Sequence, residues 1–150
     1  MVVYRASKVF NAPIKYVYQW ATDFREDDNL IWGGEHSRII LFKAKTKVVY
    51  AYYQDGWDGK PKLAVGIVVL SLSTYSWHLD YYSEEDLETG EYKLVRLGKE
   101  KTRLNMRFDN KRKLGKGPSR EDLQEGTNSL WEKYAEALEK DYSSGKKASD

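Results

Sequence analysis

His78 and Asp80 are the residues whose types and spacing come nearest to a catalytic pair. They lie two positions apart in a run that alternates polar and apolar side chains. In a strand both would share one face, where a base and an orienting carboxylate could act together. The same alternation places them opposite Trp77 and Leu79, on the side predicted to face solvent. We therefore interpret them as part of an exposed polar face, and we predict no catalytic residue.

Other residue patterns that carry chemistry are missing from the sequence. Without cysteine, the chain has no disulfide, no thiolate nucleophile and no cysteine-based zinc site. It also lacks a Gly-x-Ser-x-Gly elbow, a His-Glu-x-x-His zinc helix and a glycine-rich phosphate loop. The acidic run 26–28, with Asp23 nearby, offers carboxylate oxygens to a hard cation, but it is better interpreted as a solvated helix start. We predict neither a metal nor a cofactor.

The charges of the chain almost balance. Although 32% of the residues are charged, the net charge is only +2, which argues against a nucleic-acid partner. A local exception is the basic cluster Lys111, Arg112 and Lys113, a candidate contact for an anionic head group or phosphate. Acidic residues flank the cluster, so an exposed hairpin end is the alternative interpretation.

Aromatic residues are abundant. They make up 14% of the chain and include twelve tyrosines and five tryptophans, several of which alternate along predicted strands. Tyrosine and tryptophan combine a large apolar ring with a polar tip, so they suit the wall of a ligand pocket. Ordinary core packing explains each single ring equally well.

A long helix is the clearest element of the sequence. From Pro118 to Tyr142, apolar residues recur at steps of three and four, which places them on one broad face. Ser119 and Asp122 form a capping-box pattern at its start. A helix with such a face needs a surface to cover.

The remainder of the chain predicts one strand, two short helices and a series of further strands. The first strand covers Val2 to Phe10, a short helix begins after Pro13, and a second follows the acidic run. From His36 onward the apolar period is two, with strands at about 37–43, 47–54, 62–70, 75–83, 92–98 and 102–110 and an acidic loop at 84–90. One sheet face is apolar, and the long helix must cover it, which predicts an α+β fold.

This order of elements resembles the START-like or SRPBCC superfamily, which includes the birch pollen allergen, lipid-transfer START domains and polyketide cyclases. The most specific part is SKVFNAPIKYVYQWATDF, from Ser7 to Phe24, which is similar to that family's opening strand and helix, and Trp32 sits where such proteins often carry a tryptophan. The resemblance implies a helix-grip fold, a curved antiparallel sheet of about seven strands wrapped around the long C-terminal helix. It also implies a cavity between them for a lipid, isoprenoid, polyketide or aromatic molecule.

We therefore expect a protein that binds or transports a hydrophobic small molecule. A polyketide cyclase or aromatase on the same fold and a co-chaperone-like protein-interaction module remain alternatives. We expect a single domain over residues 1–142, a flexible tail over 143–150, a cytoplasmic location and no membrane span, because no targeting or spanning segment is recognisable.

The predicted ligand pocket combines inward-facing residues of the strands with residues of the helices. Gly126 belongs to it because a helical glycine costs about 1 kcal/mol relative to alanine, and room for a ligand would explain that cost. Close packing or simple tolerance of glycine is the alternative. The predicted lining residues are Trp20, Trp32, Tyr50, Tyr52, Trp77, Leu79, Tyr81, Tyr92, Leu94, Met106, Phe108, Gly126, Leu130, Trp131 and Tyr134.

Overall fold

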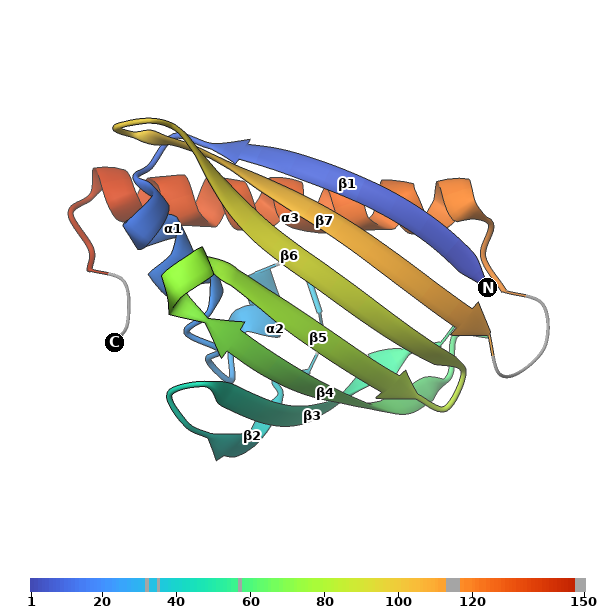
Figure 1. Ribbon diagram of the computed structural model, residues 1–150. Coiled ribbons are helices and arrows are strands. Elements are labelled where there is room, and N and C mark those ends of the chain that lie inside the picture. Colours follow the sequence, from blue (N-terminus) through green and yellow to red (C-terminus); the bar gives the residue numbers. More distant parts are fainter. Residues whose placement is uncertain (32, 35, 57, 113–116, 148–150) are drawn as a thin grey trace.

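One antiparallel sheet of seven strands forms most of the protein (Figure 1). In sequence the strands are β1 (Val2–Phe10), β2 (Ile39–Lys43), β3 (Lys47–Asp55), β4 (Pro61–Ser71), β5 (Ser76–Ser83), β6 (Asp86–Gly98) and β7 (Lys101–Arg112). Their order across the sheet is β1-β7-β6-β5-β4-β3-β2, so β1 and β2 are the edges. The computed structural model describes residues 1–31, 33–34, 36–56, 58–112 and 117–147.

The helices occupy the predicted places. α1 (Ile14–Ala21) and α2 (Asp28–Ile31) follow β1, the 3-10 helix η1 (Leu72–Thr74) joins β4 to β5, and α3 (Arg120–Ser143) ends the chain. Figure 1 shows α3 running along one face of the sheet, close to β1. The predicted α+β helix-grip architecture is confirmed. Within the described part of the chain, no helix is long and apolar enough to cross a lipid bilayer.

α3 begins with the predicted capping box. The backbone N–H of Asp122 donates to the Ser119 hydroxyl at 3.1 Å, and the backbone N–H of Ser119 donates to the Asp122 carboxylate at 3.1 Å. These two bonds satisfy donors that the first helical turn leaves without intrahelical partners. They fix the start of the helix at Arg120, two residues after the Pro118 predicted.

The C-terminal half of α3 attaches the helix to the sheet. Trp131 and Leu138 are buried, and the Trp131 ring packs edge-on against Phe10 of β1 with 6.3 Å between ring centroids. The Lys8 ammonium pairs with Glu132 at 2.6 Å at the border of this contact. This buried seam supplies most of the apolar attachment between helix and sheet.

Two glycines set the shape of the concave face of the sheet. Tyr50 of β3 lies opposite Gly66 of β4, and a Cβ atom at Gly66 would come within 2.2 Å of the Tyr50 ring. A Cβ atom at Gly90 of β6 would likewise come within 2.9 Å of the Tyr92 ring and 3.1 Å of the Phe108 ring. Large rings can lie against the strands only where the neighbouring residue has no side chain.

One predicted loop is wrong. β6 begins at Asp86, so most of the acidic segment 84–90 is strand rather than loop. Asp86 and Glu85 are buried because both pair with Arg112 of β7, at 3.2 Å and 3.1 Å. The acidic pattern predicted a loop, but the guanidinium of Arg112 on the neighbouring strand neutralises Glu85 and Asp86. The hydrogen-bonded pairing of β6 with β7 can therefore extend to Asp86.

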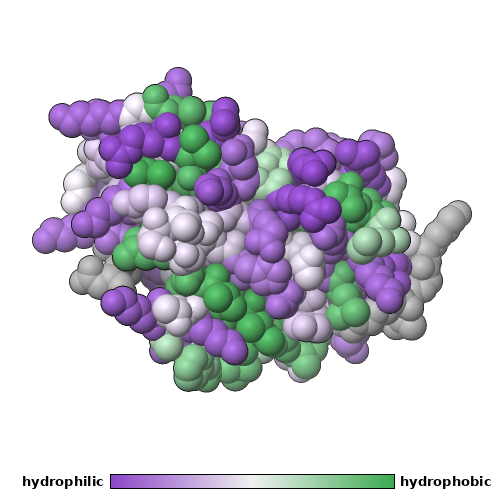
Figure 2. Space-filling view, in the orientation of Figure 1, coloured by the Kyte–Doolittle hydropathy of each residue, from purple (hydrophilic) through white to green (hydrophobic). Residues whose placement is uncertain are grey.

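The outer face of the sheet is only partly polar. Polar residues predominate on it at β5 to β7, as predicted, although Tyr82 and Leu97 are exposed there. Apolar and aromatic residues are exposed on the other strands, namely Tyr53, Leu63 and Val69 of β3 and β4 and Ile39 and Phe42 of the edge strand β2. Figure 2 shows apolar side chains (green) gathered in patches between hydrophilic ones (purple) on the face in view. The outer face is thus exposed to solvent, as the strand pattern predicted, but on β2 to β4 it carries apolar side chains as well as polar ones.

Candidate functional site

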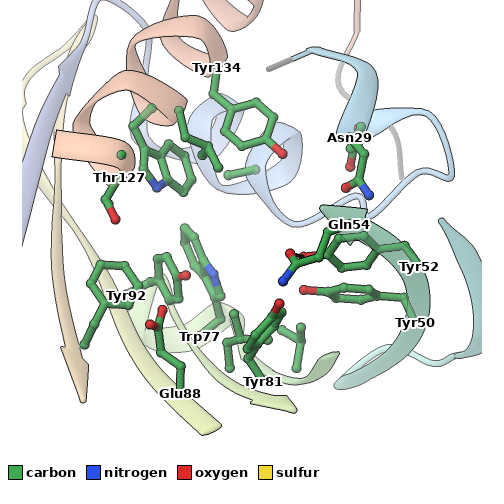
Figure 3. Close-up of a pocket in the computed structure, with 18 of the residues that line it drawn as sticks. Asn29, Tyr50, Tyr52, Gln54, Trp77, Tyr81, Glu88, Tyr92, Thr127 and Tyr134 are labelled. Atoms are coloured by element: carbon green, nitrogen blue, oxygen red, sulfur yellow. Dashed lines mark hydrogen bonds between the residues drawn. The ribbon is translucent and has the colours of Figure 1, made fainter. Parts of the chain in front are cut away.

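A cavity of about 390 Å³ lies between the concave face of the sheet and α3. This volume falls in the range of about 300–1,000 Å³ that is usual for small-molecule sites. Its wall takes residues from α1, α2, β1, β3 to β7 and α3 (Figure 3). Of the α3 residues in the wall, Asp122 and Gly126 are exposed, so the cavity reaches solvent beside the first turns of α3.

The structure brings most of the predicted pocket residues together around this cavity. Leu94 and Met106 lie in the packed core instead, each 3% exposed, and Trp32 lies outside the described residues. The binding role of all these residues stays a prediction. The predicted residues that line the cavity are Trp20, Tyr50, Tyr52, Trp77, Leu79, Tyr81, Tyr92, Phe108, Gly126, Leu130, Trp131 and Tyr134.

One side of the cavity is a group of interlocked rings. Trp77 and Tyr92 are stacked, with centroids 4.9 Å apart and planes 9° apart. Tyr92 meets Phe108 edge-on at 5.5 Å, and Phe108 stacks on Tyr4 at 4.8 Å. Because each ring is held by its neighbours, this wall is rigid and presents aromatic surface to the interior.

A second aromatic group surrounds a buried arginine. Arg38 is 6% exposed, and its guanidinium lies over the rings of Phe24 and Tyr50 at 5.2 Å and 4.7 Å from their centroids. The same guanidinium pairs with Asp28 of α2. Sequence reasoning missed Arg38 and Asp28 because the contact joins a loop and a helix that no periodic pattern relates.

Polar groups form a third part of the wall, near α2. The Tyr52 hydroxyl donates to the Gln54 amide oxygen at 3.1 Å. Asn29 is 4% exposed, and its amide nitrogen has no hydrogen-bond partner among the described residues. Figure 3 shows the Asn29 and Gln54 side chains near each other on the side of the cavity opposite Tyr92 and Glu88. A buried donor without a partner costs about 1–3 kcal/mol, so Asn29 is a place where an occupant would be stabilised.

Glu88 is the acidic group that reaches into the cavity from β6 (Figure 3). Its carboxylate accepts hydrogen bonds from the Tyr4 hydroxyl at 3.0 Å and from the Asn110 amide at 2.8 Å. Burial raises the pKa of Glu88, and these two hydrogen bonds offset that effect only in part. Sequence reasoning missed Glu88 because it falls in the segment predicted to be a loop.

Burial also acts on the tyrosines of the wall. It raises the pKa of Tyr52, Tyr81 and Tyr92, so their hydroxyls remain neutral donors and acceptors at physiological pH. The wall is thus apolar over most of its area and carries neutral polar tips at several points. Such a surface can hold a mainly apolar molecule and orient it by a few hydrogen bonds.

His78 and Asp80 pair on the outer face of the sheet, away from the cavity. The His78 Nε2 atom is 2.9 Å from the Asp80 carboxylate, and Nδ1 contacts Glu91 of β6. Partial burial of the ring acts to lower the pKa of His78, but the bonds to Asp80 and Glu91 together raise it. His78 and Asp80 thus lie on the same face of β5, the solvent-facing side that the alternation predicted.

The two charged runs singled out in the sequence are engaged in ion pairs. Arg112 pairs with two buried acids, Lys111 is exposed, and Lys113 lies outside the described residues. In the acidic run, Asp28 pairs with Arg25 at 3.5 Å as well as with Arg38. Over the described ranges, no group of three or more acidic or histidine side chains is arranged to hold a metal ion.

Comparison with known protein families and with curated protein sequences gives no match. Solved structures resemble the chain over most of its length. A Thermus thermophilus protein, TTHA0849, has a TM-score of 0.76 at 16% identity, covering 91% of this chain and 97% of that one. The aromatase/cyclase Zhui from a Streptomyces species has a TM-score of 0.67 at 14% identity, covering 91% and 87%. A START superfamily protein from Mycobacterium smegmatis has a TM-score of 0.67 at 15% identity, covering 91% and 94%.

Proposed function

We propose that this chain, which has the START-like helix-grip fold, binds an apolar and largely aromatic small molecule in the cavity between sheet and α3. The observation that carries the proposal is the cavity wall itself, in which stacked rings enclose space and the buried Asn29 amide has no partner in the described part of the chain. A bound molecule with a hydrogen-bond acceptor would cover the rings and satisfy that amide.

The physical cost of leaving the cavity empty supports the same conclusion. Side chains that line an unfilled space lose dispersion contacts on one side, and large voids destabilise a fold for that reason. Stacking between Trp77 and Tyr92 opposes a collapse of these rings into the space, and Tyr50 and Tyr92 lie close against the glycines of neighbouring positions. An occupant restores the missing contacts without any rearrangement of the wall.

A carrier role is favoured over catalysis by the placement of the titratable groups. His78 lies on the opposite face of the sheet, and Asp28 and Arg38 in the wall are paired with each other. A cyclase or aromatase is the second candidate, because Glu88 in the wall has a raised pKa, as suits a group that exchanges protons, and one similar structure is an aromatase/cyclase. These two roles differ in whether the ligand leaves unchanged.

Mass spectrometry of retained compounds tests the proposal. The purified protein is incubated with a lipid and metabolite extract, washed, and denatured to release what it holds. A compound released unchanged supports a carrier, and a compound altered during incubation supports an enzyme. Absence of any retained compound contradicts the proposal and favours an interaction module.

The variant Gly126→Trp locates the binding in the cavity. Gly126 lines the cavity, and a Cβ atom there meets no atom within 4 Å, so we expect an indole at this position to take up space that a ligand would use. We expect a folded protein that retains little or no compound. Ser129→Trp, on the exposed side of the same helix and outside the cavity wall, is the matched control and should retain as much as the parent protein. Equal retention by Gly126→Trp would contradict the assigned place.

A further inference from the structure

Glu88 is an acid of the cavity wall whose charge has no basic partner among the described residues. Both of its hydrogen bonds come from neutral donors, Tyr4 at 3.0 Å and Asn110 at 2.8 Å. The ionised group that acts on it is another carboxylate, Asp86. Neutral donors stabilise a carboxylate but leave its negative charge in place, so Glu88 retains a strong preference for a cation.

The other acids of the wall already have partners or face solvent. Asp28 pairs with Arg38, and Asp86 pairs with Arg112 at 3.2 Å. Asp122 is exposed and accepts the capping bond at the start of α3. A cation that enters the cavity therefore meets one carboxylate that is not already committed to a described arginine or to the helix cap.

The surroundings of Glu88 are suited to an organic cation rather than a metal ion. Tyr4 and Phe108 form a stacked pair beside it, and Tyr92 packs edge-on against Phe108. Figure 3 shows Glu88 on the same side of the cavity as Tyr92. Apart from Asp86, which pairs with Arg112, the side chains around Glu88 are neutral and mostly aromatic. An organic ammonium group needs one carboxylate in such surroundings, whereas a metal ion needs several oxygen ligands, and no group of three acidic or histidine side chains is arranged to supply them in the described part of the chain.

We propose that the ligand is an aromatic molecule with a protonated amine, and that the amine pairs with Glu88. This inference rests on the proposed function, since it assigns the ligand class of the same cavity. A neutral ligand leaves the Glu88 charge unpaired, and an anionic ligand is repelled by it. Asn29, which Figure 3 shows across the cavity from Glu88, donates its free amide N–H to an acceptor at the other end of the molecule.

The pairing requires Glu88 to be ionised. The tyrosines around it stay neutral, because burial raises the pKa of each, and Asp86 is held by Arg112. Lowering the pH thus protonates Glu88 while an alkyl amine keeps its proton, so the attraction weakens. The titratable groups that interact with Glu88 are Tyr4 of β1, Tyr81 of β5, and Asp86 and Tyr92 of β6. Arg112 of β7 pairs with Asp86, and Asp122 is the acid that α3 contributes to the cavity wall.

Calorimetric titration with a matched pair of probes tests the inference. Naphthylmethylamine and naphthylmethanol have the same ring system and differ in the charged group. At neutral pH we expect the amine to bind about tenfold tighter than the alcohol, the size of effect that one partly desolvated charged contact gives. The preference for the amine should shrink as the pH is lowered, because protonation removes the Glu88 charge that attracts the amine and that a neutral alcohol leaves unpaired.

The variant Glu88→Gln removes the charge and keeps the shape of the side chain. We expect it to bind both probes about as tightly as the parent protein binds the alcohol. Glu91→Gln, on the outer face of the same strand, is the control and should keep the full preference for the amine. The pH titration of the parent protein supplies an independent readout if Glu88→Gln fails to fold.

The outcomes separate this inference from the proposed function. Equal binding of amine and alcohol to the parent protein overturns the ligand class and leaves the binding function intact. An amine preference that survives in Glu88→Gln overturns the role of Glu88. Failure of both probes to bind, with Gly126→Trp and the parent protein indistinguishable in the extract experiment, overturns the proposed function itself.

Discussion

Single residues decide the chemistry of the cavity wall. Glu88 brings negative charge, Asn29 brings an unpartnered donor, and Gly66 makes room for the Tyr50 ring. None of the three belongs to a recognisable sequence motif. Their roles follow from what surrounds them, so tests at this scale change one group and measure the local consequence.

Glu88 should make stability depend on pH. Its pKa is raised above the ordinary 4.5, so the folded state holds a proton that the unfolded state releases at a lower pH. The free energy of unfolding should therefore fall as the pH rises from about 4.5 through the folded-state pKa. Urea denaturation should show Glu88→Gln gaining stability relative to the parent protein over this interval. A difference that is constant with pH would contradict the raised pKa.

Gly66→Ala should be destabilising. The added Cβ would lie 2.2 Å from the Tyr50 ring, and the ring is held by Phe24 and Arg38. Overpacking of this kind costs about 1–3 kcal/mol. Gly98→Ala is the control, because its Cβ meets the nearest atom at an ordinary 3.8 Å. Urea denaturation of both variants gives the comparison, and equal midpoints would show that the Tyr50 ring moves aside freely.

At the scale of the elements, the two halves of α3 differ in how they contact the sheet. The C-terminal half of α3 is attached to the sheet through Trp131 and Leu138, while Gly126 in the N-terminal half borders open space. The helix is thus attached to the sheet through its C-terminal half and borders open space at Gly126. No strand packs closely on Gly126, because a Cβ atom there would meet no atom within 4 Å.

Gly126→Ala should therefore stabilise the protein. Alanine favours a helix interior over glycine by about 1 kcal/mol, and the added Cβ meets nothing within 4 Å. The gain should appear as a higher urea midpoint with unchanged slope. Ser119→Ala, which removes the capping bond to the Asp122 backbone, should shift the midpoint the other way by about 1 kcal/mol. A loss of stability in Gly126→Ala would show that the site is packed.

At the scale of the whole molecule, Trp131 joins the two layers. Its ring contacts Phe10 of β1, Tyr92 of β6 and Tyr134 of its own helix, and it also lines the cavity. The fold and the candidate site therefore share a residue. Stability and ligand binding are expected to fall together when it is truncated.

Trp131→Ala should cost about 3–5 kcal/mol of unfolding free energy, because it opens a void at the junction of helix and sheet. The remaining protein should also lose affinity for naphthylmethanol. Leu72→Ala, at an exposed position in η1, is the control and should change stability by no more than about 0.5 kcal/mol. Thermal and urea denaturation provide the measurement, and a small effect at Trp131 would place the attachment of α3 elsewhere.

The sequence by itself determined the secondary structure and the layers. Apolar residues recur every two residues in a strand and every three to four residues in a helix, so their spacing shows which side of the element is apolar. The capping residues show where α3 begins. Both signals arise within one element and can therefore be found in the sequence. The faces of Tyr50, Trp77 and Phe108 follow from alternation alone, and the structure places all three on the cavity wall. From this information the α+β class could be predicted, whereas the helix-grip arrangement was implied by the resemblance of the chain to the START-like superfamily.

Only the tertiary structure decided the details that give the cavity its chemistry. Arg112 neutralises the acids that a local pattern assigned to a loop, and Arg38 reaches Asp28 and Tyr50 from a segment distant in sequence from β3. The partners of Glu88 come from β1 and β7, one 84 residues before it and the other 22 residues after it. Periodicity describes neighbours within an element, whereas charge compensation and free space depend on which elements meet. That is why the sequence predicted the aromatic wall and missed the carboxylate within it.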